Sequence, residues 1–455
     1  MKLFRRGKSL SLKDRSAVAA VVAVLLLATT RCVGQANPGS PTTEPKTHGS
    51  SPQALAAELK QEAVQVAVSI AEAYPTDPLA FALLGSAYYN TGRSDEAAVN
   101  LRKCLALNPG LADAYEVLAQ VAYDRGEIDE SVRLFQETLK RSPASITAMS
   151  RLGRALMDLG RTEESVETLR KATKLPQATS ESFYLLGQAY LQGRDYARAK
   201  ESFMQATQIS AEHTQAYFGL YTACSRLGQS EESARYREQF LKFEARDRKD
   251  LTDRNAEADT LTGLPFVRQT VAQTLFGAGQ IYKSHEQPTM ASKFFRRAAL
   301  LDEESIIYRS ALEAIYLQRK SFAEGVTVFE QLVAEQPNNY FNHIFLGRLH
   351  NRLDHFEAAE RCFQKVQELA PKWAEGYRAQ AELYLRTNRR LPESRVMAQR
   401  AADLEPKASH YHLLAVACVK NQDRSAAVEA LKQAVSLNPG ELKYQQFLQQ
   451  LQKTP

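Results

Sequence analysis

One pattern of 34 residues recurs along this chain, and it constrains the fold more than any other feature of the sequence. Four segments align without gaps, each with a leucine followed by a small residue: Leu84-Gly85, Leu118-Ala119, Leu152-Gly153 and Leu186-Gly187. They set repeat starts at 78, 112, 146 and 180, and further starts fall at 214, 272, 306, 340, 374 and 408. A fixed period of this length is typical of repeat architectures, in which each unit buries its apolar face on its neighbours.

Positions counted from the start of each repeat predict two packed helices. Apolar residues at positions 4, 7 and 11, and again at 24 and 27, have helical spacing on either side of a polar break such as 90–94. Position 8 is small in most repeats and position 24 is large and apolar, so we expect a side chain of the second helix to fill a notch on the first. The pairs include Gly85 with Leu101, Gly153 with Leu169, Gly187 with Phe203 and Gly347 with Phe363. A proline at position 32, as at Pro109, ends the second helix.

Several repeats depart from this pattern without losing the register. Repeat five has Tyr221 at position 8 and Arg237 at position 24, and repeat seven has Glu313 at position 8. Repeat three has its proline, Pro176, one residue early. In repeat nine the second helix fits only if the turn 387–392 holds one extra residue.

These motifs resemble the tetratricopeptide-repeat family, over ten units and about four fifths of the chain. The resemblance implies an all-α solenoid, a right-handed superhelix of helix-turn-helix units. We expect five repeats over 78–247 and five over 272–441, with capping helices at 54–77 and 442–455. The segment 248–271 lies outside the register and is interpreted as either an extra helix or a mobile linker.

The first 36 residues have the composition of an export signal. A basic start precedes an uncharged run from Ala17 to Thr30, and small residues follow at Gly34 and Ala36. A run of 14 residues is short for a membrane span, which needs about 20. We expect cleavage near Asn37, a flexible linker over 37–53, and a periplasmic or cell-envelope location. Retention as an amino-terminal anchor and acylation of Cys32 are the alternatives; a twin-arginine signal at Arg5-Arg6 fits its context poorly.

The positive charge of the chain resides in this leader. Residues 1–36 hold seven basic side chains and one acidic, a net charge of +6, and the whole chain also has +6. The remaining chain is therefore neutral. Because a nucleic-acid-binding domain needs a basic surface, this balance argues against that class of partner.

The sequence offers little that indicates catalysis, a cofactor or a metal. Cys104, Cys224 and Cys418 fall at the inward positions 27, 11 and 11, which predicts buried free thiols. His343 and His350 also take inward positions and, with His355, show no metal-ligand spacing. No phosphate-binding loop and no nucleophile motif appears. We therefore expect no enzyme activity, no cofactor and no metal.

The family resemblance implies that first-helix positions 2, 5, 9, 12 and 13 line a concave groove that binds peptides. In the amino-terminal repeats these positions are acidic and aromatic, with Tyr89, Asn90 and Tyr123 as candidates. In repeats eight and nine they are basic and apolar. The candidates there are Arg348, Arg352, Arg378, Arg386, Phe341 and Asn351, and Ile344 and Leu385 are expected to add apolar contacts. We expect the four arginines to hold an acidic segment of a partner.

The sequence thus predicts a non-enzymatic scaffold that binds peptide or helical segments of other proteins. The alternative is a membrane-anchored assembly subunit, or an accessory subunit of an envelope, secretion or enzyme complex. The same charged positions can also be interpreted as an ordinary solvated helix surface that binds no partner.

Overall fold

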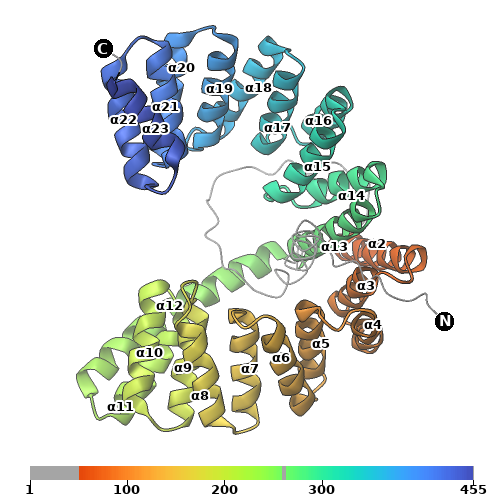
Figure 1. The fold of residues 1–455 in the computed structure, drawn as a ribbon. Coiled ribbons are helices and arrows are strands. Elements are labelled where there is room, and N and C mark those ends of the chain that lie inside the picture. The colour runs from red at the N-terminus through yellow and green to blue at the C-terminus, as the bar shows by residue number, and fades with distance from the viewer. Residues whose placement is uncertain (1–50, 259–262, 454–455) are drawn as a thin grey trace, which may run out of the picture. The chain divides into compact units, whose positions relative to one another are not determined.

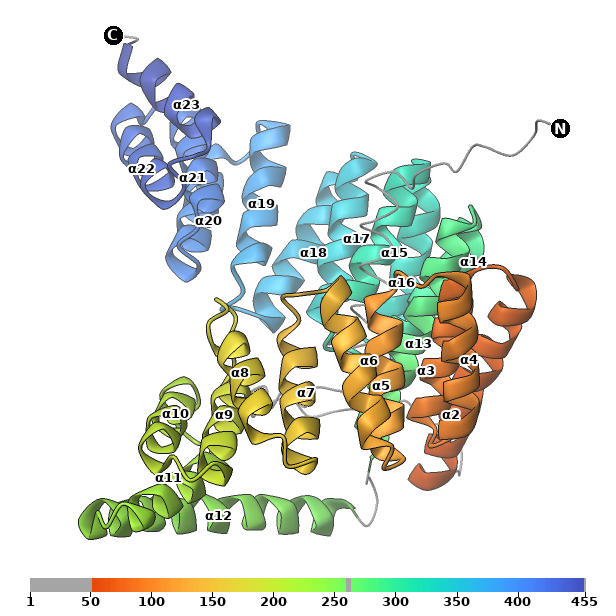
Figure 2. The ribbon, with the colours of Figure 1, turned by 60° about the horizontal axis from the view of Figure 1, so that its bottom comes forward.

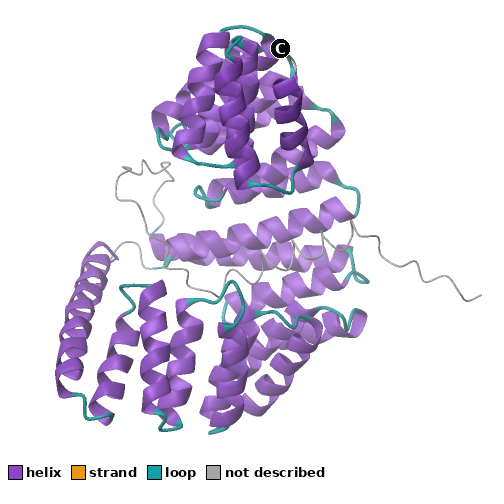
Figure 3. Cartoon of the chain, turned by 60° about the vertical axis from the view of Figure 1, so that its left-hand side comes forward, coloured by secondary structure: helices purple, strands orange, loops and turns teal. Residues whose placement is uncertain are grey.

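The computed structural model describes residues 51–258 and 263–453, and the predicted leader lies outside these ranges. Within them the chain forms helices and no strand (Figure 3). The described residues divide into two compact units after Gln287. We describe each unit by itself.

The first unit contains twelve helices in its described part (Figure 1). They are α2 (Pro52–Ala73), α3 (Pro78–Asn90), α4 (Ser94–Leu107), α5 (Ala112–Asp124), α6 (Ile128–Arg141), α7 (Ile146–Asp158), α8 (Thr162–Thr173), α9 (Ser180–Gln192), α10 (Tyr196–Ile209), α11 (Thr214–Arg226), α12 (Ser230–Ala258) and α13 (Leu264–Ser284). The first helices of repeats one to five begin at the five predicted starts. The early Pro176 of repeat three follows a second helix, α8, of only 12 residues.

The second unit contains ten helices in its described part. They are α14 (Pro288–Leu301), α15 (Ile306–Arg319), α16 (Phe322–Glu335), α17 (Tyr340–Arg352), α18 (Phe356–Leu369), α19 (Ala374–Thr387), α20 (Leu391–Leu404), α21 (Ala408–Lys420), α22 (Arg424–Leu437) and α23 (Leu442–Lys453). The first helices of repeats seven to ten again begin at the predicted starts.

The turn inside each hairpin has one conformation in all ten repeats. Position 15 has a positive φ throughout, and it is glycine in only four of them. The residues are Gly92, Gly126, Gly160, Arg194, Gly228, Glu286, Lys320, Asp354, Asn388 and Gln422. Repeat nine adds a second left-handed residue, Arg390, and its second helix starts one residue late at Leu391. The predicted extra residue in this turn is confirmed.

The predicted notch at position 8 is confirmed by the distances around its glycines. A Cβ atom added to Gly85, Gly153, Gly187 or Gly347 would lie 2.5–2.6 Å from a carbon of Leu101, Leu169, Phe203 or Phe363. Such distances are far below van der Waals contact, so each pair of helices approaches too closely for any larger residue. The opposing knobs are fully buried.

The two repeats that lack a small residue at position 8 have other close contacts at glycines. In repeat five, where position 8 is Tyr221, a Cβ on Gly219 would lie 2.5 Å from Phe203, so this ring packs between Gly187 and Gly219. In repeat seven the glycine is Gly325 on the second helix, 3.0 Å from the ring of Tyr316 if given a Cβ. Both glycines thus allow close packing against a ring, but neither contact repeats the pairing of positions 8 and 24 within one repeat.

The segment outside the register is helical in its described part. α12 continues past the repeat to Ala258, and α13 begins at Leu264, before the sixth repeat start (Figure 2). α13 then packs against α2 and α3 of its own unit, where a Cβ on Gly277 would lie 2.8 Å from Leu83. At its end His285 stacks on Tyr74 with ring centroids 4.0 Å apart, and His285 Nε2 lies 2.8 Å from Asp77 Oδ2. The repeat pattern does not predict this contact between residues about 200 apart in sequence.

Candidate functional site

The nine candidate residues lie in two units, and each set is described by itself. Tyr89, Asn90 and Tyr123 belong to the first unit, and the other six belong to α17 and α19 of the second. All come from first helices, as predicted.

Three of the four candidate arginines pair with carboxylates of the second unit, and one of these pairs joins Arg386 Nη1 to Asp354 Oδ1 at 2.9 Å. Arg378 forms a bidentate pair with Glu375, with Nε 2.6 Å from Oε2 and Nη2 2.5 Å from Oε1, and it also pairs with Glu382. Arg348 pairs with the same Glu375 and lies 3.6 Å from Glu313. Burial alone would raise the pKa of Glu375, but the hydrogen bonds from Arg378 and Arg348 hold it below its usual value. An incoming acidic segment would have to exchange with these partners.

Position 8 of repeat seven is occupied by one of these carboxylates. Glu313 is buried, and burial raises its pKa despite the nearby Arg348. The residue that breaks the sequence pattern thus becomes part of the charge network.

The candidates at positions 12 and 13 link successive repeats. Tyr89 donates to Asp124 Oδ2 at 2.6 Å, and Tyr123 donates to Asp158 Oδ2 at 2.5 Å. In the second unit Arg386 Nε donates to Asn351 Oδ1 at 3.0 Å, again across 35 residues. In each case position 12 of one repeat meets position 13 of the next. Sequence analysis placed these residues on one face but did not predict that they bind one another.

Phe341 lies in a cluster of aromatic rings at the start of α17. Its ring is 4.3 Å from that of Tyr340 and 5.5 Å from that of Trp373, and Tyr340 and Trp373 are 5.0 Å apart. All three side chains are half-buried, so each presents part of its ring to solvent. Trp373 is the only tryptophan in the chain.

The remaining candidates differ in exposure. Arg352 is exposed, and the described chain gives it no ion pair. Asn90 and Leu385 are half-buried. The expectation that Ile344 adds apolar surface is wrong, because its side chain is fully buried in the packing of the repeat.

Two carboxylates on α5 of the first unit, one buried and one half-buried, belong to the acidic face that the sequence predicts. Glu116 is 1% exposed, and burial raises its pKa to about 6 although Arg151 Nη1 lies 3.5 Å from its Oε1. Burial also raises the pKa of Asp113, one turn earlier on α5, to about 6.

The thiols and imidazoles lie where the repeat pattern predicts. Cys104, Cys224 and Cys418 are buried and free. His343 is buried, its Nε2 lies 2.8 Å from the carbonyl oxygen of Pro337, and burial lowers its pKa. In the described part of the chain no three histidine, cysteine or acidic side chains are placed to hold a metal ion.

Sequence analysis missed a buried arginine. Arg309, at inward position 4 of repeat seven, is 0% exposed. Its donors reach Asn342 Oδ1 at 2.7 Å, Gln336 Oε1 at 2.9 Å, and the carbonyl oxygens of Asp302, Ser305 and Ala299 at 3.3, 2.9 and 2.9 Å. All five N–H donors thus have an acceptor, and none of these acceptors is a carboxylate. The available signal was an arginine at a position that is aromatic or aliphatic in most other repeats.

Paired helices at a 34-residue period, closed by a knob in a notch, define a tetratricopeptide-repeat solenoid. Family models described as tetratricopeptide repeats match residues 82–146, 116–182 and 150–212, and a second such model matches 343–372 and 408–441. The chain therefore contains tetratricopeptide repeats in both units. No curated protein matches the sequence significantly.

Several solved structures are similar at low identity. Yeast Tom70 is 15% identical, with 84% of this chain and 96% of that chain covered and a TM-score of 0.37. MamA from Desulfovibrio magneticus RS-1 is 18% identical, with 37% and 94% covered and a TM-score of 0.34. YrrB, described as a TPR protein with an unusual peptide-binding site, is 15% identical, with 42% and 97% covered and a TM-score of 0.36. With TM-scores below 0.5, none of the three superposes on this chain as a whole, so none carries its function over.

Proposed function

We propose that this protein is a non-enzymatic scaffold that binds a segment of a partner protein along α17 of the second unit. The observation that carries the proposal is the half-exposed cluster of Tyr340, Phe341 and Trp373 at one end of a helix whose other end presents the exposed Arg352. Clustered, partly exposed aromatic rings and an unpaired arginine are the residue types that dominate binding at protein interfaces.

The charge network defines what kind of segment this surface favours. Arg348 and Arg378 are neutralised by Glu313, Glu375 and Glu382, so they add little net attraction for an acidic partner. Arg352 forms no ion pair within the described chain, although it lies near enough to Glu313 to lower the pKa of that carboxyl. A partner segment would match both ends of α17 if it placed an apolar residue over Phe341 and a carboxylate near Arg352. These two residues lie about 16 Å apart along the helix.

Affinity capture with two charge-reversal variants tests this proposal. Arg352→Glu should reduce capture of the partner at least about tenfold, because a favourable charge pair becomes a repulsive one. Lys293→Glu makes the same charge change at an exposed site of the same unit, on α14, and should leave capture unchanged. Equal capture by both variants would remove Arg352 from the binding surface.

We further propose that the chain is exported and that its location is the cell envelope, on the basis of the charged and apolar pattern of residues 1–36. In the described ranges, 51–258 and 263–453, no helix is long and apolar enough to cross a bilayer. Amino-terminal sequencing of the fractionated protein tests the proposed export: a start near Asn37 supports cleavage, and an intact Met1 in the membrane fraction supports an anchor.

A further inference from the structure

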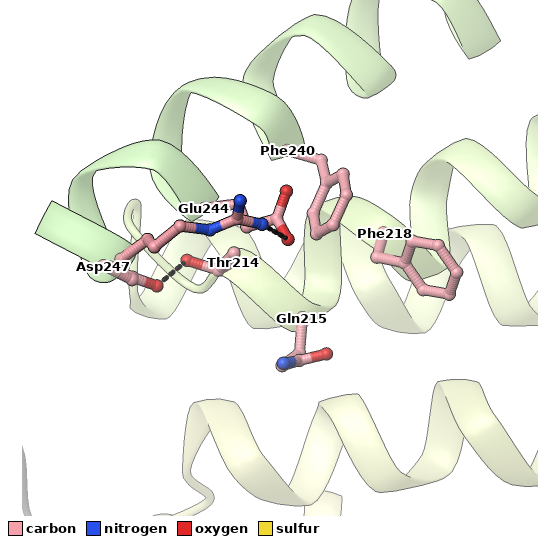
Figure 4. Close-up of a pocket in the computed structure, with 7 residues that line it drawn as sticks. Thr214, Gln215, Phe218, Phe240, Glu244 and Asp247 are labelled. Atoms are coloured by element: carbon pink, nitrogen blue, oxygen red, sulfur yellow. Dashed lines mark hydrogen bonds and ion pairs between the residues drawn. The ribbon is translucent and has the colours of Figure 1, made fainter. Parts of the chain in front are cut away.

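The two helices of repeat five border an open hollow of about 420 Å³ in the first unit (Figure 4). It is lined by Thr214, Gln215 and Phe218 of α11 and by Phe240, Glu244, Asp247 and Arg248 of α12. Phe218 is 46% exposed, which is unusual for a large apolar side chain at a repeat interface, and its ring lies 5.2 Å from that of Phe240.

Two other repeats place the ring of their position-34 residue beside the first helix. In repeat four the position-34 residue is His213, whose ring lies 5.0 Å from Tyr184 at position 5. In repeat eight it is Trp373, whose ring lies 5.5 Å from Phe341 at position 2. In both repeats an aromatic side chain from the connection to the next helix packs on a ring of the first helix.

Repeat five has no ring at this position. Its position-34 residue is Asp247, which accepts a hydrogen bond from Thr214 Oγ1 at 2.5 Å and leaves Phe218 open. The chain also makes no turn here, since α12 continues as a helix to Ala258. α13, which follows, packs against α2 and α3.

We propose that this hollow binds a tryptophan side chain from an extended segment of a partner protein, in the place that His213 and Trp373 take in their own repeats. Phe218 and Phe240 supply aromatic walls. The rim supplies acceptors for one N–H group, the carboxylates of Glu244 and Asp247, and indole is a donor only. Gln215 is exposed and makes no hydrogen bond within the described chain, so its amide is available to the partner's backbone.

The net charge of the hollow does not determine which side chain it binds. Glu244 already pairs with Arg248 at 3.0 Å, and Asp247 pairs with Arg246 at 3.1 Å. A basic side chain would have to displace these arginines, whereas an indole needs only a spare lone pair. The inference rests on the proposed scaffold function but adds a second site in the other unit.

Ligand-observed NMR with N-acetyl-tryptophanamide on the full-length chain tests the proposal. The probe should bind saturably, and N-acetyl-leucinamide should bind more weakly. Phe218→Ala removes one wall and should weaken binding about three- to tenfold, the range expected for one aromatic pair. Leu227→Ala is the matched control, because Leu227 is an exposed apolar residue that follows α11 but does not line the hollow.

The outcomes separate this site from the one on α17. Unsaturable binding to the wild-type chain, or equal binding by Phe218→Ala and Leu227→Ala, would overturn the proposal. So would sedimentation showing a wild-type dimer that Phe218→Ala converts to a monomer, because a second copy would then fill the hollow. Arg352→Glu should leave probe binding at the hollow unchanged, so failure of either site leaves the other testable. A circular dichroism melt confirms that each variant is folded.

Discussion

The two units use the same repeat geometry with opposite surface chemistry. In the first unit the contact between position 12 and the next position 13 is made by Tyr123 and Asp158, and in the second by Asn351 and Arg386. The place of the contact is the same, and its charge is reversed from acidic to basic. The repeat thus fixes where neighbouring helices meet, while the residues at the meeting points are free to set the charge of each surface.

The units also differ in how they bury charge. The first unit buries Glu116 beside Arg151 at 3.5 Å, a loose pair that leaves the carboxylate poorly compensated. The second unit buries Arg309 with every donor satisfied. The following predictions test this contrast and the shared packing, from the largest expected effect to the smallest.

Arg309→Ala should cause the largest loss of stability, about 3–5 kcal/mol in the second unit. Removal of the guanidinium leaves Asn342, Gln336 and three carbonyl oxygens short of a donor in a buried space. Urea denaturation followed through Trp373 emission measures it. Arg319→Ala, on the same helix but exposed, is the control and should change stability by less than about 1 kcal/mol. Similar losses of stability in the two variants would mean that the buried hydrogen bonds of Arg309 contribute no more than an exposed arginine does.

Gly187→Leu should destabilise the first unit by about 1–3 kcal/mol or more, because a Cβ alone would lie 2.6 Å from the ring of Phe203. The loss should spread to neighbouring repeats, since each is stabilised through its interfaces. Glu201→Leu adds a leucine at an exposed site of repeat four and should have little effect. An unchanged thermal midpoint in Gly187→Leu would show that the notch has been misplaced.

Glu116→Gln should change the pH dependence of the first unit's stability. Folding raises the pKa of Glu116 to about 6 from an ordinary value of 4.5. The folded unit therefore binds the proton more tightly than the unfolded chain does. This contribution to stability is fully present below about pH 4.5 and is lost as the pH rises through 6. The neutral glutamine should therefore be more stable than wild type at pH 8, by at most about 2 kcal/mol, and equal to it at pH 4. If the stabilities of wild type and Glu116→Gln differ by the same amount at every pH over this range, the pKa of Glu116 is not raised.

Tyr123→Phe should cost about 0.5–1.5 kcal/mol, the value of one hydrogen bond, here to Asp158. Asn351→Ala removes the corresponding partner of Arg386 in the second unit and should cost a similar amount. If only one of the two variants is destabilised, the contact between positions 12 and 13 is not equivalent in the two units. Chemical denaturation of each variant gives the comparison.

The sequence was sufficient to predict features that the period itself controls. Helix starts, the notch at Gly187 and the extra residue before Leu391 all follow from aligning repeats, because each depends on residues within one 34-residue unit. The packing of α13 on α2 was not predictable in this way, since it joins Asp77 to His285 across five repeats.

The candidate site was only partly predictable for a related reason. Repeat position places Arg348, Arg378 and Tyr123 on first helices, but the partner that each side chain selects depends on rotamers and on the neighbouring repeat. Glu375 could be seen in the sequence as a dilution of the basic face, whereas its bidentate pairing with Arg378 could not. Arg309 was missed because the repeat pattern is defined by apolar positions and gives no information about buried hydrogen bonds.

The emission of Trp373 tests the central claim, a partner-binding surface on α17, most directly. As the only tryptophan in the chain, and within the cluster of Tyr340 and Phe341, it reports on this surface without a label. Titration with a tryptophan-free segment of the captured partner should shift the emission saturably, and Phe341→Ala should weaken the interaction about tenfold or more. Binding that leaves the emission unchanged and is insensitive to Phe341→Ala would place the partner elsewhere and contradict the account.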